Sequence, residues 1–280
     1  MQQPSKTTWR LIITPSLNGA TNMAIDESIL EAITSQNAQP TLRLYSWEPA
    51  CLSLGFAQPV SDVNTKELIK RGWDLVRRPT GGRAILHCDE ITYAVIGPEN
   101  DPRLDGGVLE SYNKISQALL ATLTNLNIPA TAAPISGNQR TSRNNEHQNP
   151  VCFEVPSHYE ITVNGKKLIG SAQARRKGGV LQHGSIPIRG DLTRILQVLQ
   201  FQNEEALAQA KSRLAQRATT IEQTLGYTIN DTSFIKAMIA AFQQTLNLEI
   251  VESELSKLEL DRTDQLIREK YNNPIWTNRM

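Results

Sequence analysis

The chain has 280 residues, of which 39% are hydrophobic and 20% charged, and its formal net charge is +1. This is an ordinary globular composition, and it excludes a disordered, collagenous, coiled-coil or disulfide-scaffold chain. A chain of this length buries about 70–75% of its unfolded surface, which is enough for a large core. We expect a single domain over residues 1–280, with a core at about 30–225 and a helical part at 226–280.

Charge and hydropathy also limit the partners. The near-neutral net charge gives no global basic field for a nucleic-acid backbone. The longest apolar stretches, such as residues 91–97, are too short to span a bilayer. Residues 11–13, behind Lys6 and Arg10, do not form the apolar core of a secretion signal. We expect a cytoplasmic protein that binds neither nucleic acid nor membrane.

The first half of the chain is rich in strand signals. One helix is predicted first, because Ile25, Ile29 and Ile33 recur at four-residue spacing after Asn18. Strands are then expected at residues 41–47, 51–56, 73–77 and 91–96, with a Pro-Thr-Gly-Gly turn joining the last two.

A hairpin and several helices follow. Asn164-Gly165 predicts a type I′ turn between strands at 159–163 and 166–176. Thr219 and Glu222 have capping-box spacing, and Gly226 is a typical residue for a helix end. A further strand is expected at 180–188, and helices at 110–126, 231–246 and 256–271. Because strands come first and helices gather late, we expect an α+β fold with mixed or antiparallel sheets flanked by helices.

Three cysteines raise the question of a reactive thiol. Their odd number and their spacing match no zinc template, and free thiols are expected in a reducing compartment. Cys51 and Cys88 lie in strand-like, apolar surroundings and are interpreted as structural. Cys152 lies between a polar segment at 136–150, expected to be a mobile surface loop, and Pro156. A lysine near Cys152 would lower its pKa and supply thiolate.

Two glycine-containing segments are candidate ligand contacts. Gly81 and Gly82 allow close backbone approach, and flanking arginines can neutralise a phosphate or carboxylate. A simple turn with solvated arginines explains the same residues. In the second segment, residues 165–173, small residues on a strand indicate a face kept open for a ligand. The alternative is an edge hairpin whose lysines are solvated. Lys167 and Ile169 share one side of an extended strand. The candidates are Arg77, Arg78, Gly81, Gly82, Arg83, His87, Gly170, Ser171 and Ala172.

The histidines offer a possible base for the thiol. His183 lies in a short Gly- and Ser-flanked segment, and His87 and His158 lie elsewhere. A Cys–His pair would be typical of nucleophilic catalysis, and a hydrogen-bonded structural histidine is the alternative. The chain has only four histidines and no HExxH-type spacing, so no metal site is expected.

Taken together, these segments resemble the superfamily of lipoate–protein ligases, biotin–protein ligases and octanoyltransferases. The resemblance covers nearly the whole chain. Within it, the chain is most similar to LipM-type octanoyltransferases, whose Cys-Phe-x-x-Pro-Ser segment matches Cys152 to Ser157. The segments that carry it are 22–27, 77–87, 90–93, 152–160, 167–173, 181–185, 218–222 and 270–271, together with Trp276.

The resemblance implies a biotin/lipoate-protein-ligase-like fold and an acyltransferase. Such enzymes take an octanoyl group from acyl carrier protein and transfer it to a lysine of a lipoyl-domain protein, typically the glycine-cleavage H protein. By position, Cys152 is the nucleophile, and Lys167 lowers its pKa and assists with the oxyanion or a proton. The small and glycine-rich segments, with His183, would bind substrate. No ATP or other cofactor is expected, and we expect a monomer.

Three other functions fit parts of the same pattern. An ATP-dependent lipoate or octanoate ligase would use residues 77–83 in an adenylate site. An amidotransferase that moves acyl groups between lipoyl domains would use the same Cys and Lys, but residues 218–222 favour the octanoyltransferase. A binding module without chemistry would need neither Cys152 nor Lys167.

Overall fold

The computed structural model describes residues 4–134, 150–154 and 159–279. Eleven β-strands are formed by these residues: β1 Thr7–Ile13, β2 Thr41–Tyr45, β3 Cys51–Leu54, β4 Asp74–Arg77, β5 Ile85–His87, β6 Glu90–Pro98, β7 Ala130–Pro134, β8 Tyr159–Val163, β9 Lys166–Arg176, β10 Gly179–Pro187 and β11 Leu248–Glu252. The α-helices in the same residues are α1 Gly19–Thr34, α2 Thr65–Lys70, α3 Val108–Asn125, α4 Glu204–Arg217, α5 Ile221–Leu225, α6 Asp231–Leu246, α7 Lys257–Leu266 and α8 Pro274–Thr277.

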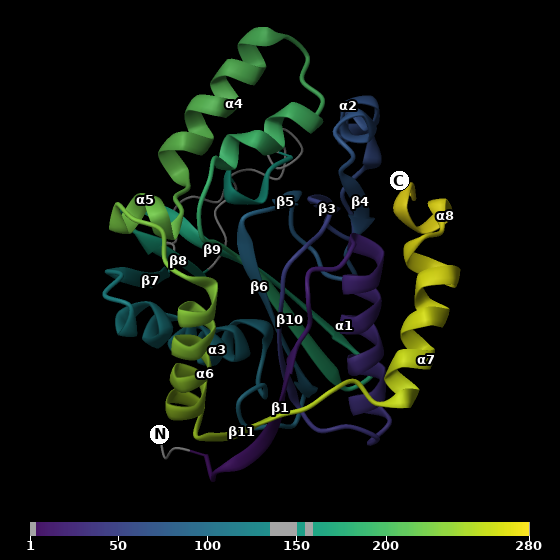
Figure 1. Ribbon diagram of the computed structural model, residues 1–280, viewed down its shortest axis with the longest axis vertical. Coiled ribbons are helices and arrows are strands. Elements are labelled where there is room, and N and C mark those ends of the chain that lie inside the picture. The colour runs from purple at the N-terminus through teal and green to yellow at the C-terminus, as the bar shows by residue number, and fades with distance from the viewer. Residues whose placement is uncertain (1–3, 135–149, 155–158, 280) are drawn as a thin grey trace.

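Most of the strands form one large mixed sheet (Figure 1). Its eight strands run in the order β11-β1-β2-β6-β10-β9-β8-β7. The strands β11, β1 and β2 pair in parallel, and the remaining neighbours are antiparallel. A separate three-stranded sheet has the order β4-β3-β5. The fold is therefore α+β with mixed sheets, as expected.

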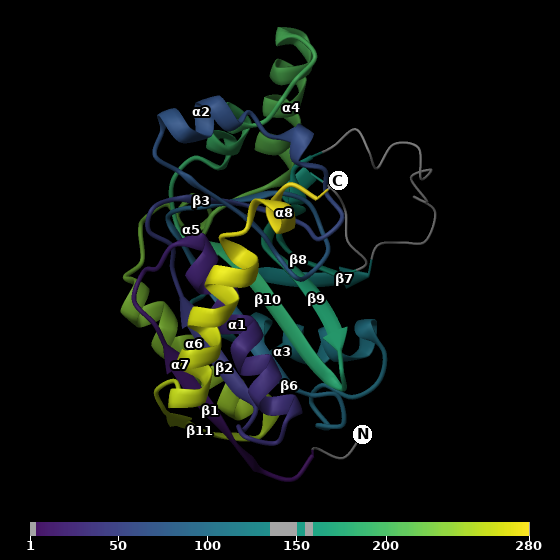
Figure 2. The same cartoon turned by 90° about the vertical axis from the view of Figure 1, so that its right-hand side faces the viewer.

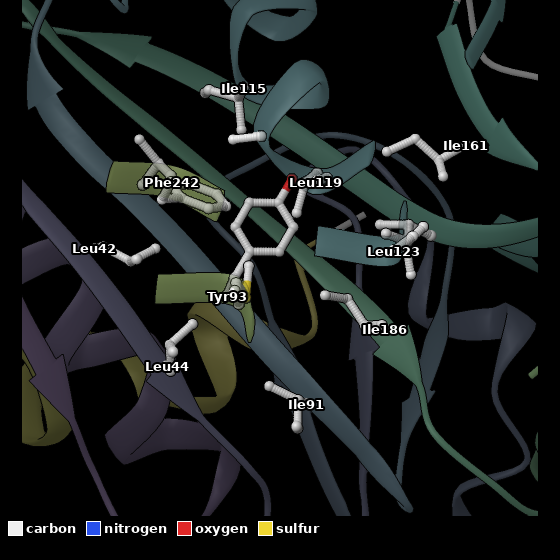
Figure 3. Packing of buried hydrophobic residues seen from close by; sticks show 14 of the residues in the cluster. Leu42, Leu44, Ile91, Tyr93, Ile115, Leu119, Leu123, Ile161, Ile186 and Phe242 are labelled. Carbon is white, nitrogen blue, oxygen red and sulfur yellow. The ribbon is translucent and has the colours of Figure 1, made fainter. Parts of the chain in front are cut away.

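Helices α3 and α6 cover one face of the large sheet, and the main core lies between them and the strands (Figure 3). Tyr93 of β6 is fully buried in this core, among leucine, isoleucine and phenylalanine side chains from the sheet and both helices. The periodicity of residues 110–126 predicted this packing, since Ile115, Leu119 and Leu123 form the buried stripe of α3.

The opposite face is covered by α1 and α7, which lie side by side (Figure 2). The side chain of Asn18 caps α1 by accepting a hydrogen bond from the backbone N–H of Thr21 at 2.9 Å. A smaller core forms beneath these helices and includes the buried thiol of Cys51. A third apolar cluster packs the small sheet against α4 and the turn at residues 152–154.

Several local predictions are confirmed. Asn164 and Gly165 have φ angles of 50° and 76°, as a type I′ hairpin turn requires, and they join β8 to β9. Gly226 ends α5 in the left-handed conformation with φ 78°. The predicted capping box is wrong by one residue, because Thr220 rather than Thr219 caps α5 by accepting from the Gln223 N–H.

Four strands were not anticipated: β1, β5, β7 and β11. The strand β5 interrupts the segment predicted to be only a turn between two strands. The strand β11 lies within the part predicted to be helical, and it pairs in parallel with β1. The large sheet therefore includes one strand that precedes and one that follows the predicted core at residues 30–225. Local patterns do not show such pairing, because each strand needs a partner far away along the chain.

Candidate active site

The turn that carries Cys152 is fastened to the glycine-rich segment. Residues 152–154 form one turn of 3₁₀-helix. The N–H of Cys152 donates to the carbonyl of Ala84 at 3.0 Å, and the N–H of Ala84 donates to the carbonyl of Pro150 at 2.9 Å. Phe153 is buried in the cluster beneath α4, whereas Cys152 is partly exposed. The thiol is therefore held on a fixed backbone and remains accessible.

A shift in strand register directs Lys167 toward this thiol. Ile161 of β8 pairs with Ile169, but Thr162 pairs with Lys167, so Leu168 is an extra residue in β9. Such a bulge reverses the alternation of faces. Lys167 and Ile169 consequently lie on opposite faces, and the expectation that they share a side is wrong. Without the bulge, Lys167 would point into the main core, where Ile161 and Ile169 pack.

The side-chain ammonium of Lys167 is buried and has charged and polar neighbours. Its Nζ lies 2.9 Å from Oε1 of Glu160 and donates to the backbone carbonyl of Cys152 at 3.2 Å. Burial lowers the pKa of Lys167, but the charges of the Cys152 thiolate and Glu160 outweigh burial and raise the pKa above its usual value. Lys167 is therefore an ammonium group beside the thiol. Sequence reasoning missed Glu160, because its approach to Lys167 depends on the register of β8 and β9.

A narrow pocket opens beside Cys152, and we call it the cysteine pocket. It encloses about 320 Å³ of space, part of it open to solvent. A Cβ atom added to Gly170 would lie 3.6 Å from Sγ of Cys152, so a larger residue there would crowd the thiol. Its lining residues are Met23, Tyr45, Trp47, Arg78, Ile85, His87, Thr92, Cys152, Gly170, Ser171, Ala172, His183, Gly184 and Ser185.

The arginines expected to bind substrate are engaged in the protein. Arg77 donates to the backbone carbonyls of Gly55 and Thr277 and does not line the cysteine pocket. Arg78 lines the pocket, and its Nη2 donates to the carbonyls of Gly81 and Arg83 at 3.1 and 3.0 Å. Burial lowers the pKa of Arg78, and the nearby charge of Cys152 offsets part of this effect. Arg78 thus shapes the turn and adds a second positive charge near the thiol.

The glycine-rich turn lies at the edge of the site rather than in its wall. Gly82 has a φ of 91°, which favours glycine, and a Cβ added there would lie 4.0 Å from Cβ of Ala172. Gly81 and Gly82 are exposed, and neither they nor Arg83 line the cysteine pocket. The turn must also stay close to Gly55, whose added Cβ would collide with the Gly82 carbonyl.

Both histidines in the pocket wall have other partners at each ring nitrogen. His183 contacts Thr80 Oγ1 at 2.7 Å and Asp26 Oδ2 at 3.2 Å. His87 contacts Ser53 Oγ at 2.6 Å and Glu90 Oε1 at 2.7 Å. These contacts favour the structural interpretation of His87 and His183 over a base for Cys152.

His183 is one end of a buried polar network that the sequence did not reveal. Asp26 accepts from Arg43 at 2.7 Å and from the Tyr45 hydroxyl at 2.9 Å. Burial alone would raise the pKa of Asp26, but Arg43 and His183 hold it below its usual range. Burial lowers the pKa of His183, and the hydrogen bond to Asp26 offsets part of that effect. The network fixes α1 against β2 and β10 behind the pocket.

The structure thus brings together Cys152 and Lys167, with Arg78, His87, His183 and the small residues 170–172 around them. His158, Pro156, Ser157 and residues 136–149 lie outside the described residues. Among residues 4–134, 150–154 and 159–279, no three His, Cys, Asp or Glu side chains form a group that could hold a metal ion. No helix in those same ranges is both long and apolar enough to cross a membrane.

Residues 18–243 match the model of the lipoyl protein ligase A/B catalytic domain. The chain belongs to this family. An octanoyltransferase LipM from Carboxydothermus hydrogenoformans is 41% identical over 96% of this chain and 98% of its own length. The corresponding protein from Brevibacillus brevis is 37% identical, with 97% and 99% covered. These full-length matches make the chain an acyltransferase of that family.

Solved structures with low sequence identity share the fold. A bipartite lipoate protein ligase with its E2 lipoyl domain from Thermoplasma acidophilum has a TM-score of 0.78 at 21% identity, covering 98% of this chain and 97% of that one. A lipoate-protein ligase A bound with ATP has a TM-score of 0.77 at 22% identity, covering 97% and 98%. The expected ligase-like fold is therefore confirmed.

Proposed function

We propose that the protein transfers an octanoyl group from octanoyl-acyl carrier protein to a lysine of a lipoyl-domain protein, such as the glycine-cleavage H protein, through a thioester on Cys152. The observation that carries this proposal is the position of Cys152 in the wall of a narrow pocket, beside the Lys167 ammonium. The full-length relatives named as octanoyltransferases support the choice of acyl group.

The first half-reaction exchanges one thioester for another. The Cys152 thiolate attacks the carbonyl carbon of the donor, and the carrier's sulfur leaves and takes a proton. The energies of the two thioesters are similar, so the acyl group moves without ATP. In this proposal the Lys167 ammonium favours the thiolate and stabilises the oxyanion of the tetrahedral intermediate.

The second half-reaction forms an amide. The neutral amine of the acceptor lysine attacks the Cys152 thioester, the new C–N bond forms, and the Cys152 sulfur leaves as thiolate. The amine loses a proton to solvent water in the same step. Because an amide is much more stable than a thioester, this step makes the overall transfer strongly favourable.

Apolar walls would hold the alkyl chain during both steps. Met23, Trp47 and Ile85 line the cysteine pocket together with the small strand face at Gly170 and Ala172. Burying each methylene group contributes up to about 0.8 kcal/mol, so eight carbons supply ample binding energy for selection.

The test is an intact mass spectrum of the purified protein mixed with octanoyl-acyl carrier protein in the absence of ATP. We expect one octanoyl adduct on Cys152, which disappears when apo lipoyl domain is added. Cys152→Ser should form no adduct and lose at least about a thousandfold in transfer rate while keeping its fold. The matched control, Cys88→Ser, should react normally.

Two results would overturn the proposal. Modification of the lipoyl domain only after free octanoate and ATP are supplied, with no adduct, would make the protein a ligase. Acylation of Cys152 only by octanoylated lipoyl domain, and not by the acyl carrier protein, would make it an amidotransferase.

A further inference from the structure

A second cavity lies next to the cysteine pocket. It encloses about 400 Å³ of space, part of it open to solvent. Val151 and Phe153 line it, whereas Cys152 between them lines the cysteine pocket. The two spaces therefore lie on either side of the turn that carries the thiol. The other residues of the second cavity are Ile85, Leu86, Cys88, Glu90, Ser185, Pro187, Asp191, Leu192, Arg194, Ile195 and Leu214.

Among the residues that the structure describes, Ile85 and Ser185 line both spaces, and we call this pair the partition. Ser185 is fixed, because its hydroxyl donates to Glu90, whose carboxylate also contacts His87 and Thr92. Ile85 is buried in the cluster under α4, and its side chain has no polar group to hold it. The removable part of the partition is therefore the Ile85 side chain.

The second cavity has the chemistry of an alkyl-chain site. Leucine, isoleucine, valine and proline side chains form most of its wall. Its cationic residue, Arg194, forms an ion pair with Asp89 at 2.6 Å and is about one-third exposed, so it does not present an unpaired charge to the interior. The buried carboxylate of Glu90 already contacts the side chains of His87, Thr92 and Ser185. An apolar chain is thus a better occupant than a charged one.

We propose that Ile85 determines the acyl-chain length that the enzyme accepts, and that the second cavity receives the end of a longer chain when Ile85 is shortened. The inference rests on the proposed function, because it concerns an acyl group attached to Cys152. Ile85 follows Ala84, whose carbonyl accepts from the Cys152 N–H, and Ser185 pairs with Gly170, so the partition lies beside the thiol. The Ile85 side chain thus separates the second cavity from a chain that starts at the Cys152 sulfur. Removing that side chain joins the two spaces and adds room beyond the native pocket.

The experiment compares octanoyl- and dodecanoyl-acyl carrier protein as donors for wild type, Ile85→Ala and Leu68→Ala. Leu68 is the matched control, because it is similarly buried in the same cluster but lines neither space. Acylation rates are measured by intact mass. Ile85→Ala should raise the dodecanoyl-to-octanoyl rate ratio at least about tenfold, since one methylene already changes discrimination by that order. Leu68→Ala should leave the ratio unchanged.

An unchanged ratio in folded Ile85→Ala, or an equal rise in Leu68→Ala, would overturn the inference. If Ile85→Ala does not fold, Ile85→Val is used, and it should raise the same ratio in the same direction. Binding of free octanoate and dodecanoate to the Cys152→Ser forms, measured by calorimetry, separates the two proposals. A shift toward dodecanoate in the Ile85 variant supports the partition even if no donor acylates Cys152.

Discussion

Arg43 and Lys167 are both buried cations, but they have different partners. Arg43 is bonded within the packed interior, whereas Lys167 lies next to a cysteine in the wall of a pocket. Arg43 donates to the Asp26 carboxylate at 2.7 Å and to backbone and side-chain oxygens of Asn22 at 3.0 and 2.7 Å. These partners are one buried carboxylate and neutral oxygens. Lys167 lies between the Glu160 carboxylate and Cys152, and its Nζ contacts Glu160 at 2.9 Å and the Cys152 carbonyl at 3.2 Å.

The partners of a buried cation decide what its charge does. A cation with permanent, fully buried partners stabilises one arrangement of α1 against the sheet, and breaking that pair leaves an uncompensated charge. A cation beside a nucleophile in a pocket wall favours one ionisation state of that nucleophile. The two clusters should therefore respond differently to mutation, reagent and pH.

The largest expected contrast is between Cys152 and the two other thiols, Cys51 and Cys88. Burial raises the pKa of Cys51, on the Arg43 side, well above its usual value, and raises the pKa of Cys88 to about 12. A rise of about three units lowers thiolate content about a thousandfold. Iodoacetamide at pH 8 should modify Cys152 alone in the folded protein and all three cysteines after unfolding, as peptide mass mapping will show. Equal labelling of Cys88 in the native protein would contradict the contrast.

The next effect is on stability. Asp26→Ala should lower the free energy of unfolding by about 3–5 kcal/mol, because it strands the buried Arg43 guanidinium. Glu160→Gln should cost no more than about 1–2 kcal/mol, because its side chain is partly exposed and its amide still accepts a hydrogen bond. Urea denaturation measures both. A Glu160→Gln loss as large as that of Asp26→Ala would remove the distinction between the clusters.

A smaller effect is expected on thiol reactivity. Lys167→Ala should slow alkylation of Cys152 at neutral pH about tenfold, because the ammonium that favours the thiolate is gone. Lys166→Ala is the matched control, since the Lys166 ammonium instead donates to the Ala215 carbonyl. The pH profile of iodoacetamide reaction reports the effect. An identical profile for the two variants would exclude Lys167 from this role.

The smallest effect is the pH dependence of stability from His183. Its pKa is lowered in the folded protein, so below about pH 6.5 the unfolded chain binds a proton that the folded chain does not. Stability is therefore lost as the pH falls from about 6.5 toward the lower folded pKa, by up to about 1.4 kcal/mol per pH unit. His183→Gln should flatten the unfolding free energy between pH 6.5 and 5 relative to wild type. An equally steep decline in the variant would assign the dependence to other groups.

Sequence patterns predicted the parts of the molecule that depend on neighbouring residues. The hairpin at Asn164-Gly165 and the buried stripe of α3 need only local conformation and helical period, and both are confirmed. The motif resemblance selected Cys152 and Lys167, and the two residues do lie together. Their catalytic roles stay predictions until the mass spectrum and alkylation experiments are done.

Features that depend on distant pairing were not predicted. The bulge at Leu168 turns Lys167 toward the thiol, and it arises from the match between β8 and β9 rather than from β9 alone. Glu160 becomes a partner of Lys167 through that same match. Arg77 looked like a ligand residue because of its neighbours in sequence, but its hydrogen-bond acceptors include Thr277, 200 residues further along the chain.

The contact between Arg77 and Thr277 has a consequence for the order in which the protein matures during synthesis. Two guanidinium nitrogens of Arg77 bond to the Thr277 carbonyl, and the Trp276 indole donates to the Arg77 carbonyl at 3.0 Å. The strand β4, which leads into the glycine-rich turn, is thus held by hydrogen bonds to Trp276 and Thr277, which are synthesised late. Cys152 is translated well before these residues, so the strand that leads into the glycine-rich turn gains its last hydrogen-bond partners only when α8 has been made.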